Sequence, residues 1–114
     1  MEIVHADYQV HYDEEGGIIA CQGSFRLHGG DEYKPILDIL LSAADATPET
    51  LTLDVRELKF LNSSGINTLS KFILQVRKHK VSKVVIHGSS RYPWQEKSLT
   101  NFQRLLPGLT MQID

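Results

Sequence analysis

The stretch LTLDVRELKFLNSSGINTLSKF, residues 51–72, decides how this chain folds. Residues 51–55 (LTLDV) form a short, mostly apolar run with the length of a strand. Asn62-Ser63-Ser64-Gly65 then supplies small and polar residues of the kind that favour turns and helix N-termini. A helical apolar rhythm follows at spacings of three and four residues: Ile66, Leu69, Ile73 and Val76. A strand joined to an amphipathic helix predicts an α/β unit, in which the next strand pairs in parallel.

Toward the N-terminus the pattern predicts a β-hairpin followed by a helix. Apolar and polar residues alternate over residues 8–12 and again over residues 18–27, with a glycine-containing turn at residues 13–17 between them. Gly29-Gly30-Asp31 offers a helix start, and apolar residues then return at helical spacing until Thr47-Pro48-Glu49 breaks the pattern. We therefore expect two antiparallel strands and then an amphipathic helix.

Toward the C-terminus the alternation of strand and helix continues. Residues 84–86 form a short apolar strand, and a helical pattern after Pro93 stops at Pro107-Gly108. Residues 110–113 predict a last edge strand. The predicted order is β-β-α-β-α-β-α-β, which makes one α/β domain over residues 1–114, with a mixed sheet and helices packed on it.

Composition points away from nucleic acid and membrane as partners. The formal net charge is −2, and the basic residues are scattered. No apolar run approaches about 18 residues and no signal-peptide pattern begins the chain, so a cytoplasmic protein is expected. The single cysteine, Cys21, lies in an alternating apolar run, which favours a buried thiol in a reducing compartment. The five histidines show no ligand spacing, so neither a metal nor a cofactor is predicted.

Parallel pairing should bring two loops to one edge of the sheet. In open α/β sheets, functional groups collect at the carboxyl ends of the parallel strands. The turn at residues 62–65 and the loop at residues 89–94 both follow such ends, so we expect them to be neighbours. Arg91, Tyr92 and Trp94 are residue types that interfaces favour.

The helix that follows the serine turn should carry a polar stripe: Ser64, Thr68, Lys71, Gln75 and Lys78. Two interpretations of the turn remain open at this point. In the first, Asn62 or Ser63 caps the helix, which stabilises it by about 1 kcal/mol, and the turn has no other role. In the second, the Ser64 hydroxyl accepts a phosphate. The free N–H groups and the positive dipole end of the first turn would tolerate its added charge of about −1.5 to −2.

This region resembles the signature of the STAS domain family, the bacterial anti-sigma-factor antagonists. Members of the family typically carry an apolar strand ending in Asp, two apolar residues in a connector, the motif Asp-Ser-Ser-Gly and an amphipathic helix. The matching residues here are Asp54, Phe60-Leu61 and Asn62-Ser63-Ser64-Gly65, so Asn62 stands where the family usually has Asp. The predicted order of elements also matches the family's architecture, and the likeness therefore covers nearly the whole chain.

The resemblance implies a regulatory protein that switches partners and catalyses nothing itself. In such systems the unmodified antagonist binds an ATPase-type serine kinase, which doubles as the anti-sigma factor, and so frees a sigma factor. The kinase phosphorylates the second serine of the motif, Ser64 here, and a metal-dependent PP2C-type phosphatase removes the phosphate. Ser63 and Thr68 are alternate acceptors. The predicted partner-binding residues are Phe60, Leu61, Asn62, Ser63, Ser64, Gly65, Thr68, Lys71, Arg91, Tyr92 and Trp94.

Functions of other classes are alternatives to this regulatory role. An enzyme is disfavoured, because the serines lack the Gly-x-Ser-x-Gly context of a hydrolase and no Gly-x-x-x-x-Gly-Lys phosphate loop is present. A scaffold or sensor module without phosphorylation is an alternative. So is a switch whose target is a signalling enzyme, such as a nucleotide cyclase. The sequence leaves the oligomeric state open.

Overall fold

A computed structural model describes residues 1–46, 49–79 and 83–114. Thr47 and Pro48, two residues of the expected helix break, lie outside the described residues. Within the described ranges, no helix is long and apolar enough to cross a membrane. In chain order the elements are β1 (Glu2–Val4), β2 (Tyr8–Asp13), β3 (Ile18–Phe25), α1 (Gly29–Asp45), β4 (Thr50–Leu61), α2 (Ser63–His79), β5 (Lys83–Gly88), α3 (Pro93–Leu105) and β6 (Thr110–Ile113).

The strands form one mixed sheet in the order β1-β2-β3-β4-β5-β6. β1, β2 and β3 pair antiparallel, and β3 to β6 pair in parallel, so the predicted hairpin and crossovers are confirmed. One strand was not predicted: β1 precedes the expected order and forms the N-terminal edge in place of β2. Its three residues are too few to show an alternating pattern, and Val4 is 65% exposed.

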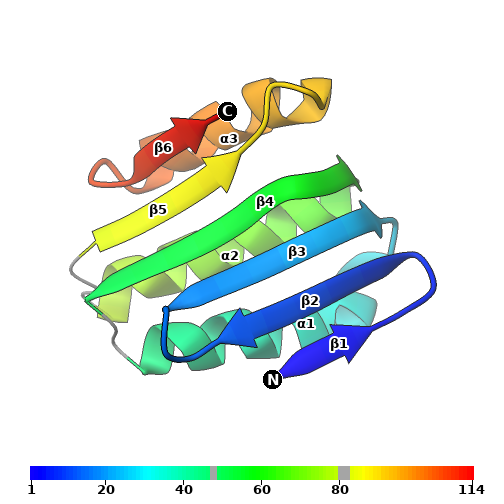
Figure 1. Ribbon diagram of the computed structural model, residues 1–114, viewed down its shortest axis with the longest axis horizontal. Helices are drawn as coiled ribbons and strands as arrows, with labels where there is room; N and C mark the ends of the chain where they lie inside the picture. Colours follow the sequence, from blue (N-terminus) through cyan, green and yellow to red (C-terminus); the bar gives the residue numbers. More distant parts are fainter. Residues whose placement is uncertain (47–48, 80–82) are drawn as a thin grey trace.

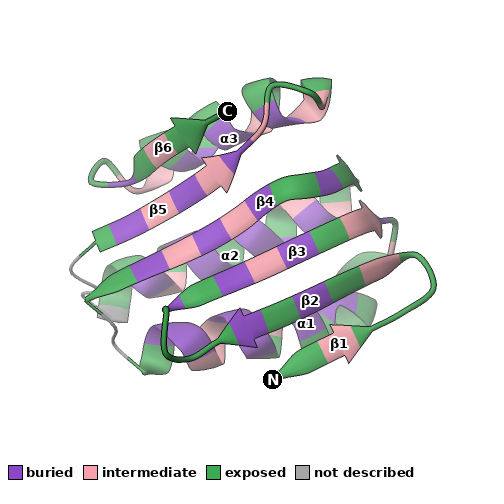
Figure 2. Ribbon diagram, viewed as in Figure 1, coloured by how far each residue is buried: buried purple, intermediate pink, exposed green. Residues whose placement is uncertain are grey.

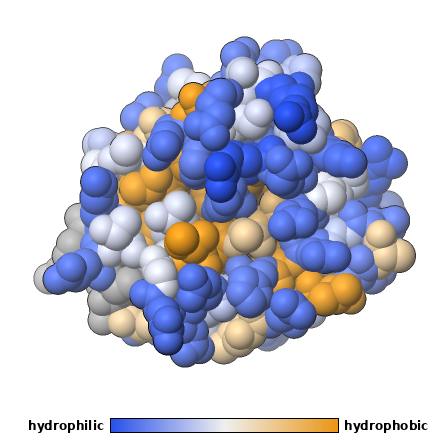
Figure 3. Space-filling model, in the orientation of Figure 1, coloured by the Kyte–Doolittle hydropathy of each residue, from blue (hydrophilic) through white to orange (hydrophobic). Residues whose placement is uncertain are grey.

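All three helices cover the same face of the sheet, as Figure 1 shows. This arrangement follows from the order of the strands, because each parallel strand adds to the same side through a crossover of the same hand. No helix of the described residues lies over the opposite face. Figure 3 shows that face to be mainly hydrophilic, with apolar side chains scattered among polar ones.

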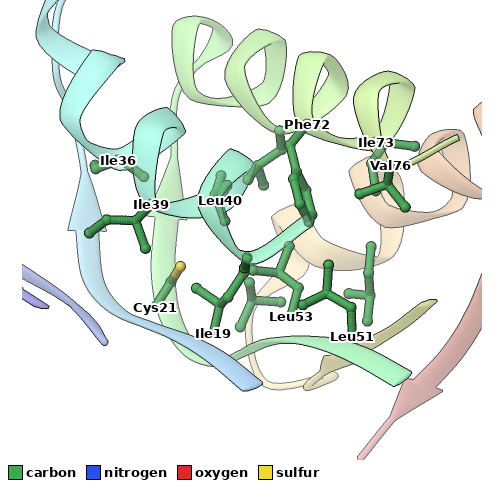
Figure 4. Packing of buried hydrophobic residues seen from close by; sticks show 14 of the residues in the cluster. Ile19, Cys21, Ile36, Ile39, Leu40, Leu51, Leu53, Phe72, Ile73 and Val76 are labelled. Carbon is green, nitrogen blue, oxygen red and sulfur yellow. The ribbon is translucent and has the colours of Figure 1, made fainter. Parts of the chain in front are cut away.

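The core lies between the sheet and the helices. Buried residues alternate with exposed ones along β2 and with partly exposed ones along β5, which Figure 2 shows as bands of colour. Side chains from β3, β4, α1 and α2 meet in the middle of the core (Figure 4): Ile19, Cys21, Leu51, Leu53, Ile36, Leu40, Phe72 and Ile73. The prediction that the single cysteine is buried is confirmed, and burial together with the charge of Asp54 raises the pKa of its thiol to about 12.

Strand β4 is longer than predicted, because it continues from the expected apolar run to Leu61. Two register shifts against β3 give β4 two extra residues, so Ala20 opposes Asp54 while Ser24 opposes Phe60. The buried side chains after the first shift are therefore three residues apart: Val55, Leu58 and Leu61. A regular strand buries every second residue, so a spacing of three does not predict a strand from the sequence.

Candidate partner-binding site at the serine turn

Asn62 caps helix α2. Its side-chain Oδ1 accepts a hydrogen bond from the backbone N–H of Gly65 at 2.9 Å, and its backbone carbonyl accepts one from Ile66 N–H, also at 2.9 Å. The side chain thereby satisfies one of the N–H groups that the first turn of a helix leaves free. The interpretation of Asn62 as an N-cap is confirmed.

The same side chain also joins the turn to helix α1. Tyr33 Oη donates to Asn62 Oδ1 at 2.6 Å, and Asn62 Nδ2 donates to the carbonyl of Leu27 at 2.8 Å. An Asp could accept the bonds from Tyr33 and Gly65, but it has no N–H to donate to Leu27. Asn62 therefore suits a cap that must also bind a carbonyl. Burial raises the pKa of Tyr33 to about 12, so its hydroxyl stays protonated and keeps donating at neutral pH.

Gly65 is needed because the chain passes close to its neighbours. A β-carbon at this position would lie 2.8 Å from Tyr33 Oη and closer still to the side chain of Leu61. Its role is to let α2 approach the end of β4 and the start of α1. Gly65 is itself buried, and it contributes to the shape of the turn from inside the molecule.

Ser64 has a half-buried side chain whose hydroxyl faces the start of α1. The backbone N–H of Gly29, the first residue of α1, donates to Ser64 Oγ at 3.3 Å. Two helices thus begin beside this one hydroxyl. Ser63, the first alternate acceptor, is exposed.

A hollow of about 330 Å³ opens beside Ser64, between the start of α1 and the outer side of α2. It is lined by Gly30, Ser64, Asn67, Thr68, Ser70, Lys71 and Leu74. Lys71 is exposed, and its ammonium lies 3.8 Å from where a β-carbon of Gly30 would stand. Leu74, at the far end of the hollow, is 42% exposed. This surface combines a hydroxyl, a cation and an apolar side chain.

Three residues of the predicted partner surface are buried in the folded chain: Leu61, Gly65 and Thr68. The expectation that Thr68 lies on an exposed polar stripe is wrong, since it is only 4% exposed. Its hydroxyl donates to the Ser64 carbonyl at 2.9 Å, one turn back along α2. Thr68 nevertheless lines the hollow beside Ser64, together with Gly30 of α1.

Phe60 remains on the surface, as predicted. Its ring is 39% exposed at the end of β4, and the guanidinium of Arg26 lies 4.9 Å from the ring centroid. This is the distance of a cation–π contact. The pair presents an aromatic ring and a positive charge at the same edge of the sheet as the serine turn.

The loop after β5 leaves the same edge of the sheet but is bound to other residues (Figure 1). Trp94 Nε1 donates to the Leu58 carbonyl at 3.0 Å. Gln95 is fully buried: its Nε2 donates to the carbonyls of Val55 and Leu58, and its Oε1 accepts from Ser89 N–H. These bonds hold the loop and the first turn of α3 against the bulged part of β4, whereas the serine turn is bound to α1.

Arg91 and Tyr92, also predicted as partner residues, lie elsewhere. Arg91 is exposed and lines a separate hollow of about 400 Å³ on the uncovered face of the sheet, together with Asp54 and Arg56. Tyr92 is half-buried beside the Arg91 guanidinium. Sequence reasoning missed Gln95, because a lone Gln in a helix gives no sign that it will be buried.

Asp54, the strand acid of the motif, belongs to a charged cluster on the uncovered face. Its carboxylate accepts from Arg56 Nε at 3.1 Å and from Nη2 at 2.9 Å, and Arg56 and His87 also approach Asp114. Burial by itself would raise the pKa of Asp54, but the hydrogen bonds from Arg56 and the charges of Arg56 and His87 lower it. Among the described residues, no group of three or more His, Cys, Asp or Glu is placed to hold a metal ion.

No protein-family model matches this chain, and no curated protein matches it either. Solved structures of SiaC from Pseudomonas aeruginosa do match. In the complex of the diguanylate cyclase SiaD with its activator SiaC, the match has a TM-score of 0.72 and 16% identity over 100% of this chain and 99% of that chain. A structure of SiaC by itself matches with a TM-score of 0.73 and 15% identity, over 100% of this chain and 98% of that chain. Apo-SiaC matches with a TM-score of 0.68 and 14% identity, over 98% of this chain and 93% of that chain.

This chain has the fold of SiaC. The likeness spans both chains almost entirely, and it confirms the predicted STAS-like mixed α/β fold. With identities of 14–16%, the likeness is one of fold.

Proposed function

We propose that this protein is a regulatory protein that acts by binding a signalling enzyme, and that phosphorylation of Ser64 controls this binding. The observation that carries the proposal is the position of the Ser64 hydroxyl. It lies in the first turn of α2, half-buried, with the N–H of Gly29 donating to it and a hollow beside it. A phosphate there would change the charge of the surface while α2 stays folded, since negative charge is favourable at a helix N-terminus.

The fold likeness supports a proposal about the class of target. SiaC is the activator of a diguanylate cyclase, and this chain matches its fold from end to end. A nucleotide cyclase is therefore the class of partner that we propose first. The surface around Ser64 fits a protein partner, because Lys71 and Leu74 offer a cation and an exposed apolar side chain beside the hydroxyl.

We propose binding and not catalysis as the activity of this chain. The Ser64 hydroxyl accepts a bond from a backbone N–H, and no described His, Asp or Glu is hydrogen-bonded to it as a base would be. An ATPase-type serine kinase would add the phosphate and a PP2C-type phosphatase would remove it, as the resemblance to the anti-sigma-factor antagonists implies.

The first test is mass spectrometry of the intact protein and its fragments, purified from its own organism with and without phosphatase treatment. A phosphate on Ser64 is the expected result. The unmodified protein and the Ser64→Asp variant are then added to cyclases encoded near its gene, and binding and cyclase rate are measured. We expect the unmodified protein to bind one of them and to change its rate.

A second candidate output is a sigma factor, and the Asn-Ser-Ser-Gly motif favours it. In that case the unmodified protein binds an ATPase-type kinase in the presence of nucleotide and leaves every cyclase rate unchanged. If no phosphate is found under any growth condition although a partner is bound, the protein is a constitutive scaffold and phosphorylation control is wrong.

A further inference from the structure

We propose that Lys71 is the residue that receives the phosphate of Ser64 within the same molecule, so that phosphorylation closes an ion pair across the hollow between α1 and α2. This inference rests on Ser64 as the acceptor in the proposed function. It adds a named positioning residue, which the motif does not include.

The hollow brings the two side chains together. Ser64 is in the first turn of α2, and Lys71 follows two turns later on the same side of the helix. Side chains of a helix lean toward its N-terminus, so the Lys71 chain extends back toward Ser64. Both side chains line the same space of about 330 Å³, which has room for a phosphate group.

The start of α1 lies beside both Ser64 and Lys71. Gly29 N–H donates to Ser64 Oγ, and the Lys71 ammonium lies beside the next residue, Gly30. Because neither glycine has a side chain, the ammonium can lie over the backbone at the point where Ser64 meets α1. A phosphate on Ser64 Oγ would therefore enter the space next to the Lys71 ammonium.

The Lys71 ammonium has no ion pair or hydrogen bond to another described residue, and it lies near the positive end of the α1 dipole. This local positive potential would favour a phosphate dianion. Ionisable groups at the start of α1 are His28, just before the helix, and Asp31 and Glu32 in its first turn. The carboxylates of Asp31 and Glu32 would repel a phosphate on Ser64. The positive charge of Lys71 would offset this repulsion.

The ion pair would give phosphorylation two effects on one surface. It adds negative charge at Ser64, and it occupies the cation that a partner's carboxylate would otherwise meet at Lys71. Leu74 would remain exposed beside a neutralised lysine. The switch would therefore remove a positive recognition group as well as add a bulky one.

The test uses the full chain with phosphoserine genetically encoded at position 64, so it needs neither the kinase nor the partner. The second pKa of the phosphate, ordinarily about 6, is measured by 31P NMR titration. In the phosphorylated protein we expect this pKa to be lower than in the same protein with Lys71→Gln by at least about half a unit, the value for charges about 5 Å apart with the full screening of bulk water. Lys71→Arg should restore most of the shift.

Lys78→Gln is the matched control, because Lys78 is an exposed lysine on the same helix, two further turns away. It should leave the phosphate pKa within about 0.1 unit of the starting protein. Equal values in Lys71→Gln and Lys78→Gln, with both proteins folded by amide NMR spectra, would overturn the inference about Lys71. That result would leave Ser64 phosphorylation in the cell untouched, whereas absence of phosphate in the cell would overturn the proposed function and not the ion pair.

Discussion

The serine turn after β4 and the loop after β5 leave the same edge of the sheet, yet they use their polar side chains differently. In the serine turn, Asn62 makes the structural bonds and leaves Ser63 and Ser64 at or near the surface. Where the loop after β5 enters α3, Trp94 and Gln95 turn inward to the carbonyls of β4. From residue type alone, both segments were predicted to be contact surfaces.

The difference arises where β4 continues beyond the end of β5. The residues of β4 after Asp54 are not paired with β5, so the backbone carbonyls on that side of β4 need other hydrogen-bond donors. Trp94 and Gln95 supply those donors at Leu58 and Val55. The serine turn follows the last residue of β4, where α1 satisfies its polar groups. One segment is therefore part of the scaffold, and the other is the better candidate for recognition.

The largest expected effect tests whether the serine turn depends on close packing. Gly65→Ala should lower the free energy of unfolding by roughly 3 kcal/mol, because the new methyl group meets Tyr33 Oη and Leu61 in a packed region. Urea unfolding measures this loss. Gly108→Ala is the control, since no atom lies within 4 Å of a β-carbon built there, and it should change the free energy by less than about 0.5 kcal/mol. Similar values for the two variants would contradict the packing role.

The next effect concerns recognition at the same turn. Ser64→Asp should weaken binding of the partner by at least tenfold, about 1.4 kcal/mol, because it places a negative charge in the proposed interface. Stability should change little, since a carboxylate is favourable in the first turn of α2. Titration calorimetry and thermal unfolding measure the two quantities. An unfolded Ser64→Asp protein would show that the hydroxyl is structural, and the comparison of the two loops would then fail.

A smaller effect is expected in the loop after β5. Trp94→Phe removes the indole N–H that donates to Leu58 and should cost about 1 kcal/mol of stability, with partner affinity unchanged. The Leu58 carbonyl keeps its bond from Gln95, which limits the loss. Arg91→Ala, at an exposed position, shows whether the loop has any part in binding. A tenfold loss of affinity in either variant would extend the recognition surface to this loop.

The smallest expected effect is a pH dependence on the uncovered face. The pKa of Asp54 is lowered in the folded protein, so its contribution to stability is present above the unfolded pKa of about 3.9 and is lost as the pH falls through the folded value. The difference in unfolding free energy between the natural protein and Asp54→Asn should therefore shrink from pH 6 toward about pH 3. A constant difference across this range would show that the Arg56 contact does not favour the charged carboxylate.

Sequence reasoning was accurate where local periodicity carries the information. The spacing of Ile66, Leu69, Ile73 and Val76 predicted α2, and Asn62 was recognised as a possible cap. It failed at Thr68, which looked like part of a polar stripe. A hydroxyl that bonds back to the Ser64 carbonyl no longer needs water, and only the neighbouring α1 decides whether that side of the helix is covered.

The sequence by itself determined the types of the main elements, the parallel pairing after the hairpin and the start of α2 at the serine turn. Tertiary structure alone decided the length of β4, the inward direction of Trp94 and Gln95, and the meeting of Ser64 with the start of α1. Those contacts join residues about 35 positions apart in the chain, as between Gly29 and Ser64. Periodicity reports only on neighbours along the chain, whereas such contacts depend on how complete elements pack against one another.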